Sequence, residues 1–135
     1  MRIVIDTNVL VSAMLTPDGN AWRVVLAVTS GMCKLLLDER IMFECRSVLK
    51  RSKFGLNEAD VDLLCDFLER VGEIIVPMPI SSQLPDANDL SFIEVAVSGK
   101  ADVIVTGNSK HYPSGIRRKF DLTVLTPTEF LAVLK

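Results

Sequence analysis

The sequence predicts an α/β fold with three layers, α/β/α, in which a central parallel sheet is covered by helices on both faces. Short apolar runs alternate with segments of helical periodicity along the chain. These runs are continuous, as in strands that are buried on both faces of a parallel sheet. The 135 residues and the apolar content of 49% suffice for one core. We therefore expect a single domain over residues 1–135.

The first half of the chain alternates between apolar runs and helical patterns. Asp38 and Asn57 are the expected N-caps of two helices, because a short polar side chain there accepts a hydrogen bond from the first turn. Gly55 separates these two helices. The expected elements are a strand at 3–5, a helix through residue 14, a helix at 21–29, a strand at 34–37, a helix at 38–51 and a helix at 57–70.

The second half continues this alternation. We expect a strand at 73–76, an uncharged, proline-containing loop at 77–85, a helix at 86–98, a strand at 103–105, a polar loop through 115, a strand at 123–125 and a terminal helix from Pro127. In such parallel sheets, ligands bind in the crevice beyond the carboxyl ends of the strands. The chemistry is therefore expected just after residues 5, 37 and 105.

The cysteines and the N-terminus favour a cytoplasmic protein without a membrane partner. The 3 cysteines are widely spaced and form no C-x-x-C motif, which is typical of free thiols in a reducing compartment. Asp6 interrupts the N-terminal apolar run before it resembles a secretory signal. No uncharged apolar stretch approaches the ~20 residues of a membrane span.

The charge distribution allows a nucleic-acid enzyme but does not require one. A net charge of −2 is mild evidence against a protein that coats DNA. It is compatible with an enzyme that holds RNA through metal ions and a local basic patch. Two basic segments, 50–53 and 117–119, are candidates for such a patch. A solvated helix end or loop is the alternative explanation for each.

Asp6 is the first candidate functional residue, because it ends a buried strand and precedes a helix. A free carboxylate at that position points into the crevice beyond the sheet. The alternative is a helix N-cap, since Asp is a good capping residue. Thr7 and Asn8 could serve that purpose equally well, and only one cap is needed.

Glu44 is singled out by its position on the predicted helix at 38–51. It completes the apolar stripe formed by Ile41, Cys45 and Val48. A carboxylate in an apolar position is costly unless a cation compensates it. A bound divalent ion is one explanation, and a pairing with Arg40 or Lys50 is the other.

Asp86 and Asp89 open the predicted helix at 86–98. Asp86 could be its N-cap, and Asp89 in the first turn would be stabilised by the helix dipole. Asp is nevertheless a poorer partner than Glu in a capping box, because its side chain is shorter. Asp89 is therefore the stronger functional candidate of the two.

The polar residues after the predicted strand at 103–105 form the third candidate group. Thr106 and Asn108 can orient water or a phosphate, and Asn108 can supply a neutral oxygen ligand. An ordinary strand-to-loop turn is the alternative. His111 is the only histidine, and a structural or solvated role is the more common one for a loop histidine. A phosphate-binding glycine loop, a nucleophile elbow and an H-E-x-x-H motif are all missing from the sequence.

Taken together, these residues resemble the PIN domain, the nuclease fold of VapC-like toxins, over nearly the whole chain. The segment 4–8 resembles the opening strand motif of that family, with Asp6 as its first metal-binding acid. Glu44 and Asp89 resemble the second and third acids. The strand and turn at 103–108 resemble the place where many PIN domains carry a fourth acid. The segment 106–113 resembles one subgroup, the toxin components of PIN-family toxin–antitoxin systems.

The resemblance implies a divalent-metal-dependent endoribonuclease that uses Mg²⁺ or Mn²⁺. Hard oxygen ligands suit both ions, and two ions can hold the attacking and leaving oxygens of a phosphodiester. The implied roles are metal binding and catalysis by Asp6, Glu44 and Asp89, support of a second ion by Asn108 and Asp86, and orientation of the ligands by Asn8 and Thr106.

The resemblance also implies partners, namely an RNA substrate, an antitoxin protein and a second copy in a homodimer. One departure from the family is Asn108, which stands where many relatives have Asp. It favours the alternative function, a catalytically weakened PIN-like domain that binds RNA or protein. A phosphotransfer domain is a third possibility, but Asp6 lacks a paired acid nearby and Lys110 lies outside any clear match to such domains.

Overall fold

The computed structural model describes residues 1–134, with the side chain of Asn88 excepted. Lys135, the expected last residue of the domain, lies outside the described residues. Within them, the sheet has the strand order β3-β2-β1-β4-β5, and all neighbouring strands are parallel. The strands are β1 (Arg2–Ile5), β2 (Lys34–Leu37), β3 (Glu73–Ile74), β4 (Val103–Val105) and β5 (Val124–Leu125). The predicted α/β class with a central parallel sheet is confirmed.

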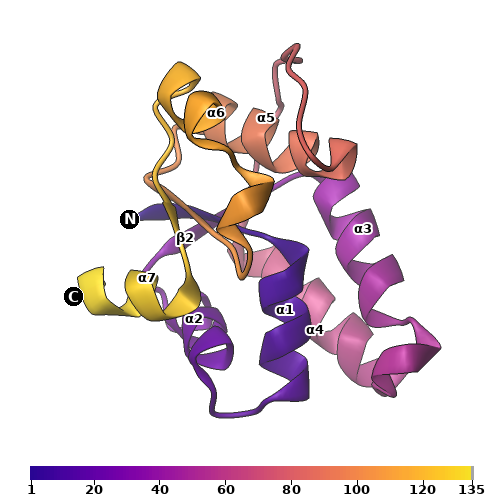
Figure 1. Cartoon of the computed structure of the whole chain (residues 1–135). Coiled ribbons are helices and arrows are strands. Elements are labelled where there is room, and N and C mark those ends of the chain that lie inside the picture. Colours follow the sequence, from indigo (N-terminus) through magenta and orange to yellow (C-terminus); the bar gives the residue numbers. More distant parts are fainter. Residues whose placement is uncertain (135) are drawn as a thin grey trace.

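The helices cover both faces of the sheet. Figure 1 shows α5 and α6 above the strands and α1, α2 and α4 below them. α5 contacts β1, β2 and β4, whereas α4 contacts β2. The α-helices are α1 (Thr7–Leu15), α2 (Asn20–Thr29), α3 (Glu39–Leu49), α4 (Glu58–Val71), α5 (Leu90–Ser98), α6 (Ser114–Lys119) and α7 (Pro127–Val133). The 3-10 turns are η1 (Ser52–Phe54), η2 (Ala87–Asp89) and η3 (Ser109–His111).

The register of the two central strands positions the site. Ile5 of β1 pairs with Val105 of β4. The next residues, Asp6 and Thr106, therefore leave the sheet side by side although they are 100 positions apart. The two strands that lead to these residues are almost fully apolar and buried. The polar residues therefore gather at the carboxyl ends of the strands.

The two predicted caps, Asp38 and Asn57, are present, and a third cap at Thr126 was not predicted. Asp38 accepts a hydrogen bond from the Ile41 N–H at 2.9 Å and begins α3. Asn57 accepts bonds from the first turn of α4. Thr126 and Glu129 form a reciprocal capping box in front of α7, where Pro127 occupies the first turn.

Three predicted boundaries were wrong. The helix expected from Asp86 begins at Leu90, because the N–H of Asp89 bonds to the C=O of Asp86 and forms the tighter 3-10 turn η2. β3 stops at Ile74, shortly before prolines that cannot donate to a ladder. The polar loop expected through residue 115 contains η3 and leads into α6.

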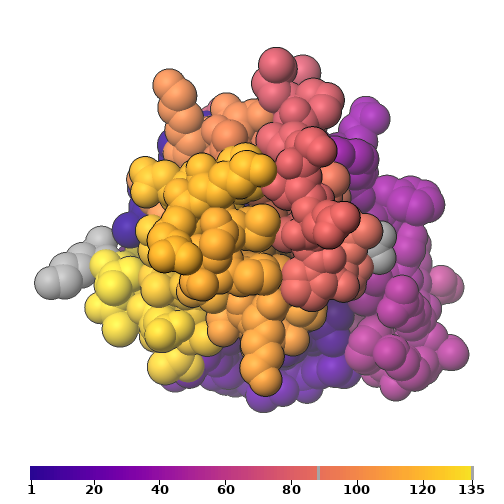
Figure 2. Space-filling model, turned by 45° about the horizontal axis from the view of Figure 1, so that its top comes forward, coloured from indigo at the N-terminus to yellow at the C-terminus, as the bar shows by residue number. Residues whose placement is uncertain are grey.

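The segment between β3 and α5 lies on the surface. Figure 2 shows it running between the C-terminal third of the chain and α3. The N–H of Ile80 donates to the carboxylate of Glu94 on α5 at 2.9 Å, which ties this segment to the helix below it. No helix in residues 1–134 has both the length and the apolarity needed to cross a membrane.

Candidate metal centre

Asp6 occupies the N-cap position of α1, but its carboxylate makes no capping bond. Its Oδ2 atom instead accepts hydrogen bonds from Thr106 Oγ1 at 2.9 Å and from the Tyr112 hydroxyl at 3.1 Å. Its backbone N–H donates to the C=O of Val105. The carboxylate is buried. These contacts turn the side chain away from the helix and hold it at the end of the sheet.

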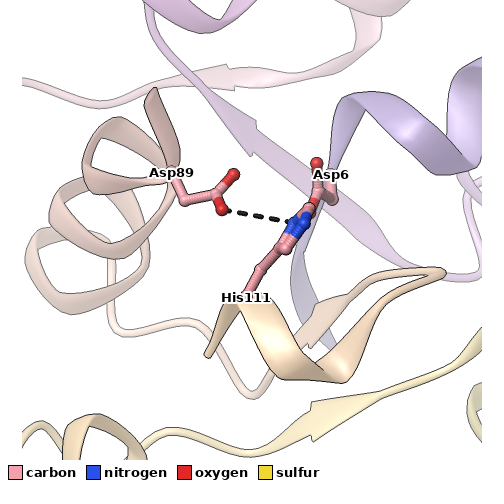
Figure 3. Close-up of side chains that lie close together, drawn as sticks. All are labelled: Asp6, Asp89 and His111. Atoms are coloured by element: carbon pink, nitrogen blue, oxygen red, sulfur yellow. Dashed lines mark ion pairs between the residues drawn. The ribbon is translucent and has the colours of Figure 1, made fainter. Parts of the chain in front are cut away.

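Asp6, Asp89 and His111 form a compact cluster. Their ligand atoms all lie within 4.8 Å of one another. The Nδ1 atom of His111 lies 3.2 Å from Oδ2 of Asp89 and 3.9 Å from Oδ2 of Asp6. Figure 3 shows Asp89 and His111 pointing towards each other beside Asp6, each from a different element.

Two atoms of this cluster face each other at 3.2 Å without forming a hydrogen bond. Oδ2 of Asp89 and Nδ1 of His111 are buried and have no hydrogen-bond partner among the described residues. A buried polar atom without a partner is costly, and most such atoms in proteins are satisfied. A carboxylate oxygen and an imidazole nitrogen are both common ligands of divalent transition metals. The cluster therefore fits a bound cation.

Asp89 lies among other carboxylates, whose negative charge a bound cation would neutralise. Burial raises the pKa of Asp89 to about 7, and the negative charges of Asp6, Asp86 and Glu44 act in the same direction. His111 opposes them. Burial and the nearby Asp6 also raise the pKa of Tyr112, which keeps its hydroxyl protonated as a donor to Asp6.

This raised pKa predicts the pH dependence of the metal-free protein. Between about pH 4 and pH 7, folded Asp89 keeps a proton that the unfolded chain has lost. The free energy of unfolding should therefore fall as the pH rises through that window, by about 2 to 4 kcal/mol. Urea unfolding in EDTA measures it. Asp89→Asn should lose this contribution, and the control Asp18→Asn should keep it; equal slopes in all three proteins would contradict the prediction.

Glu44 faces the same cavity from α3. Thr7 Oγ1 donates to its Oε2 at 2.6 Å. Neither basic residue proposed as its partner contacts it, because Arg40 pairs with Asp38 and Glu94 and Lys50 pairs with Asp62. Its carboxylate has no cationic partner in the described part of the chain. Glu44 is not one of the three residues of the tight cluster, so it lies at the edge of the candidate centre.

Asn8 and Thr106 organise the loop behind Asp6. Asn8 accepts a hydrogen bond from the N–H of Gly107 at 2.8 Å and donates to Thr106 Oγ1 at 3.3 Å. Thr106 is fully buried, and its hydroxyl donates a hydrogen bond to Asp6. A Cβ on Gly107 would lie 3.3 Å from Asn8 Oδ1, so this close approach suits glycine. The orienting role expected of Asn8 and Thr106 remains a prediction that this geometry supports.

Asp86 and Asn108 differ in their placement. Asp86 lines the cavity and is exposed. The Oδ1 atom of Asn108 accepts a bond from the N–H of Lys110 at 3.2 Å and thereby caps η3. Asn108 is not among the residues that line the cavity in the described structure. This capping contact corresponds to the strand-to-loop turn that was the alternative explanation for Asn108.

The cavity has a volume of about 400 Å³. Acidic side chains dominate its polar lining, and Arg51 and His111 are the basic ones among the described residues. Its lining residues are Asp6, Thr7, Asn8, Val11, Ser12, Glu44, Val48, Arg51, Phe54, Asp86, Asp89 and His111. The predicted acids from distant parts of the chain therefore share one cavity.

The sequence analysis missed His111 and Tyr112 as members of the site. Both follow Thr106 in the polar loop, whose folding into η3 brings them back over Asp6. The available signal was the run 106–113 that resembles a toxin subgroup. Periodicity could not place it, because the segment is neither a strand nor a long helix.

Comparison with known proteins shows the family of this chain. A family model described as PIN domain matches residues 2–110. The chain belongs to the PIN domain family. It is 28% identical to the uncharacterized protein MJ1680 of Methanocaldococcus jannaschii, and the alignment covers 97% of this chain and 90% of that protein.

The fold is also similar to a solved structure. The match is to a chain in the crystal structure of VapBC2 from Rickettsia felis bound to a DNA fragment from their promoter. The TM-score is 0.61 at 15% sequence identity, and the match covers 93% of this chain and 98% of that chain. This similarity shows a PIN-like, VapC-like fold.

Proposed function

We propose that this protein is a divalent-metal-dependent endoribonuclease that acts as the toxin of a toxin–antitoxin pair. The observation that carries the proposal is the cluster of Asp6, Asp89 and His111, in which two buried ligand atoms lack hydrogen-bond partners within the described residues. Membership of the PIN domain family supports a nuclease.

We assign the ligand roles as follows. Asp6, Glu44 and Asp89 hold Mg²⁺ or Mn²⁺ directly or through water and are the catalytic residues. His111 adds a nitrogen donor to the same cluster. Asp86 and Asn108 are assigned to support of a second ion, for which the Asn108 side chain would have to release the N–H of Lys110. The orienting residues are Asn8 and Thr106.

Hydrolysis of a phosphodiester needs an activated water and relief of negative charge in the transition state, and a divalent ion supplies both when bound. The chain's own residues prepare the site for this. Thr106 and Tyr112 fix one oxygen of Asp6, so that its carboxylate stays in place. Thr7 holds Glu44 at the cavity wall. The apolar strands behind them exclude water from the inner side of the site.

Metal dependence tests the proposal. Purified protein should cleave single-stranded or structured RNA with Mn²⁺ or Mg²⁺ and should be inactive in EDTA. Mn²⁺ should be bound more tightly than Mg²⁺, because an imidazole nitrogen suits transition metals better than Mg²⁺. Titration of each ion by calorimetry, beside cleavage on a gel, measures both effects. Cleavage that persists in EDTA would contradict the proposed chemistry.

The partners are part of the same proposal. The structural neighbour is a VapBC2 complex, which supports an antitoxin as a partner of this protein. We also propose a homodimer, on the basis of the family resemblance. Each subunit would be a single PIN-like domain over residues 1–135. Co-expression with the product of an adjacent small open reading frame, followed by size-exclusion chromatography, tests both associations.

One observation favours the alternative function, a catalytically weakened PIN-like domain that binds RNA or protein. Asn108 carries no charge, and its oxygen is already occupied by the N–H of Lys110. The second ion would then have fewer ligands than in relatives with Asp there. Calorimetry distinguishes the two functions, because a weakened domain should show no detectable binding of Mn²⁺ at millimolar concentration.

A further inference from the structure

We propose that Arg51 and Phe54 form a subsite that binds one unpaired nucleotide beside the candidate metal centre. This inference rests on the proposed ribonuclease function and adds the class of substrate, which is single-stranded RNA. It concerns the basic segment 50–53, for which a solvated helix end was the alternative explanation.

The four residues of this segment have different surroundings. Lys50 is committed to α4, because its Nζ atom lies 2.8 Å from Asp62. Arg46, one turn earlier on α3, also pairs with acids of α4. The side chain of Arg51, in contrast, is exposed and forms no ion pair or hydrogen bond with the rest of the described chain.

Arg51 is placed on the wall of the acidic cavity. Glu44, Val48 and Arg51 follow one another at intervals of four and three residues, so one side of α3 and its end face the cavity. Four carboxylates line the same cavity, yet Arg51 pairs with none of them in the described structure. A guanidinium is well suited to bind a phosphate through two parallel hydrogen bonds. The acids, which would hold the metal, and Arg51 line one cavity and together suit a phosphodiester.

Phe54 contributes an aromatic ring to the same wall. It is half-buried and lines the cavity, but it is not among the residues that pack against the core of the described chain. Gly55 closes η1 with φ at 63°, a left-handed conformation that ends the turn directly after Phe54. The ammonium of Lys53 lies over the Phe54 ring, 5.1 Å from its centre, so a stacking base must use the other face of the ring or displace Lys53.

An aromatic ring beside a free cation is the usual arrangement for binding single-stranded nucleic acid. An unpaired base stacks on the ring, whereas the phosphate pairs with the cation. A paired base is already stacked within its helix and is less available to the ring. The subsite therefore selects unpaired nucleotides and places the neighbouring phosphate towards Asp6 and Asp89.

The test measures binding of a fluorescein-labelled oligouridylate of about ten nucleotides, a length suited to a single-strand site. Ca²⁺ replaces Mn²⁺ in the anisotropy titrations, and a gel verifies that the RNA stays intact. Arg51→Gln should raise the Kd about tenfold and lower the slope of log Kd against log salt by about 0.7, the value for one phosphate contact in a single strand. The control Arg23→Gln removes an exposed arginine that lines a different hollow and should change neither quantity.

The aromatic residue is tested separately. Phe54→Leu should raise the Kd about tenfold without changing the salt slope, because stacking releases no counterions. Phe54→Tyr, which keeps an aromatic ring, should bind the RNA as tightly as wild type. A purely structural role of Phe54 would instead lower the melting temperature of the leucine variant and leave the Kd of the folded protein unchanged.

The outcomes separate this inference from the proposed function. Calorimetry should give an affinity for Mn²⁺ no weaker than that of wild type in Arg51→Gln, because Arg51 is not a ligand and its positive charge does not attract the ion. If wild-type protein binds and cleaves RNA while Arg51→Gln and Arg23→Gln behave alike, the subsite is wrong and the nuclease stands. If wild-type protein binds no RNA, the proposed function and this inference fail together.

Discussion

Replacement of Asp6 by Asn should abolish Mn²⁺ binding and lower kcat/KM for RNA cleavage at least about 1,000-fold, which corresponds to about 4 kcal/mol of transition-state stabilisation. The physical reason is the loss of the central negative charge of the cluster with Asp89 and His111. The amide oxygen of Asn can still accept the bonds from Thr106 and Tyr112, so the fold should persist. Calorimetry, initial rates and circular dichroism measure these three properties.

The same substitution should make the metal-free protein more stable. Asp6 is one of the charges that raise the pKa of Asp89, and its removal relieves their repulsion. Asp18→Asn is the matched control, because Asp18 lies on an exposed turn outside the cavity. Retained cleavage in Asp6→Asn would remove Asp6 from the mechanism, and loss of activity through unfolding would show that its role is structural.

Replacement of Arg40 by Met should lower the free energy of unfolding by about 3 kcal/mol, because it leaves two buried carboxylates without their cation. Arg40 donates to Glu94 at 2.6 Å and to Asp38 at 2.8 and 2.9 Å. Both acids are about 5% exposed. Urea unfolding at neutral pH measures the change, with Arg23→Met as the control, because Arg23 is exposed and has no ion pair among the described residues.

A second variant verifies the cause of this effect. Glu94→Gln in the Arg40→Met background removes one of the uncompensated charges and should recover part of the lost stability. The carboxylate of Glu94 also holds the N–H of Ile80, in the segment that leads to Asp86 and Asp89. If Arg40→Met unfolds at the same urea concentration as Arg23→Met, the ion pairs contribute nothing measurable.

The strands were predictable because burial determines their composition. Each predicted apolar run is a strand at or near its expected place, and the caps Asp38 and Asn57 are present. The start of α5 was wrong because Asp86 and Asp89 suit a 3-10 turn and an α-helix equally well at the level of sequence. The choice depends on the long segment before them, whose path is set by contacts such as that of Ile80 with Glu94.

The site was predictable only in part, for a similar reason. The apolar stripe of α3 singled out Glu44, and the structure places it on the cavity wall. The same stripe could not decide which acid Arg40 contacts. Arg40 pairs with Glu94 on α5. A local sequence pattern cannot predict that α5 packs near α3. The placement of His111 in the site likewise depends on how η3 folds, which the sequence pattern did not predict.

The pairing of β1 with β4 has a consequence for protein synthesis. Thr106 donates to Asp6 across 100 positions, and Tyr112 reaches it across 106. A nascent chain therefore carries its first acid out of the ribosome long before the residues that hold this acid in place. Only when the last third of the polypeptide has emerged can the centre form, because contacts between distant segments close late in folding. If the protein has the ribonuclease activity proposed above, that activity would be absent until its own translation is nearly complete.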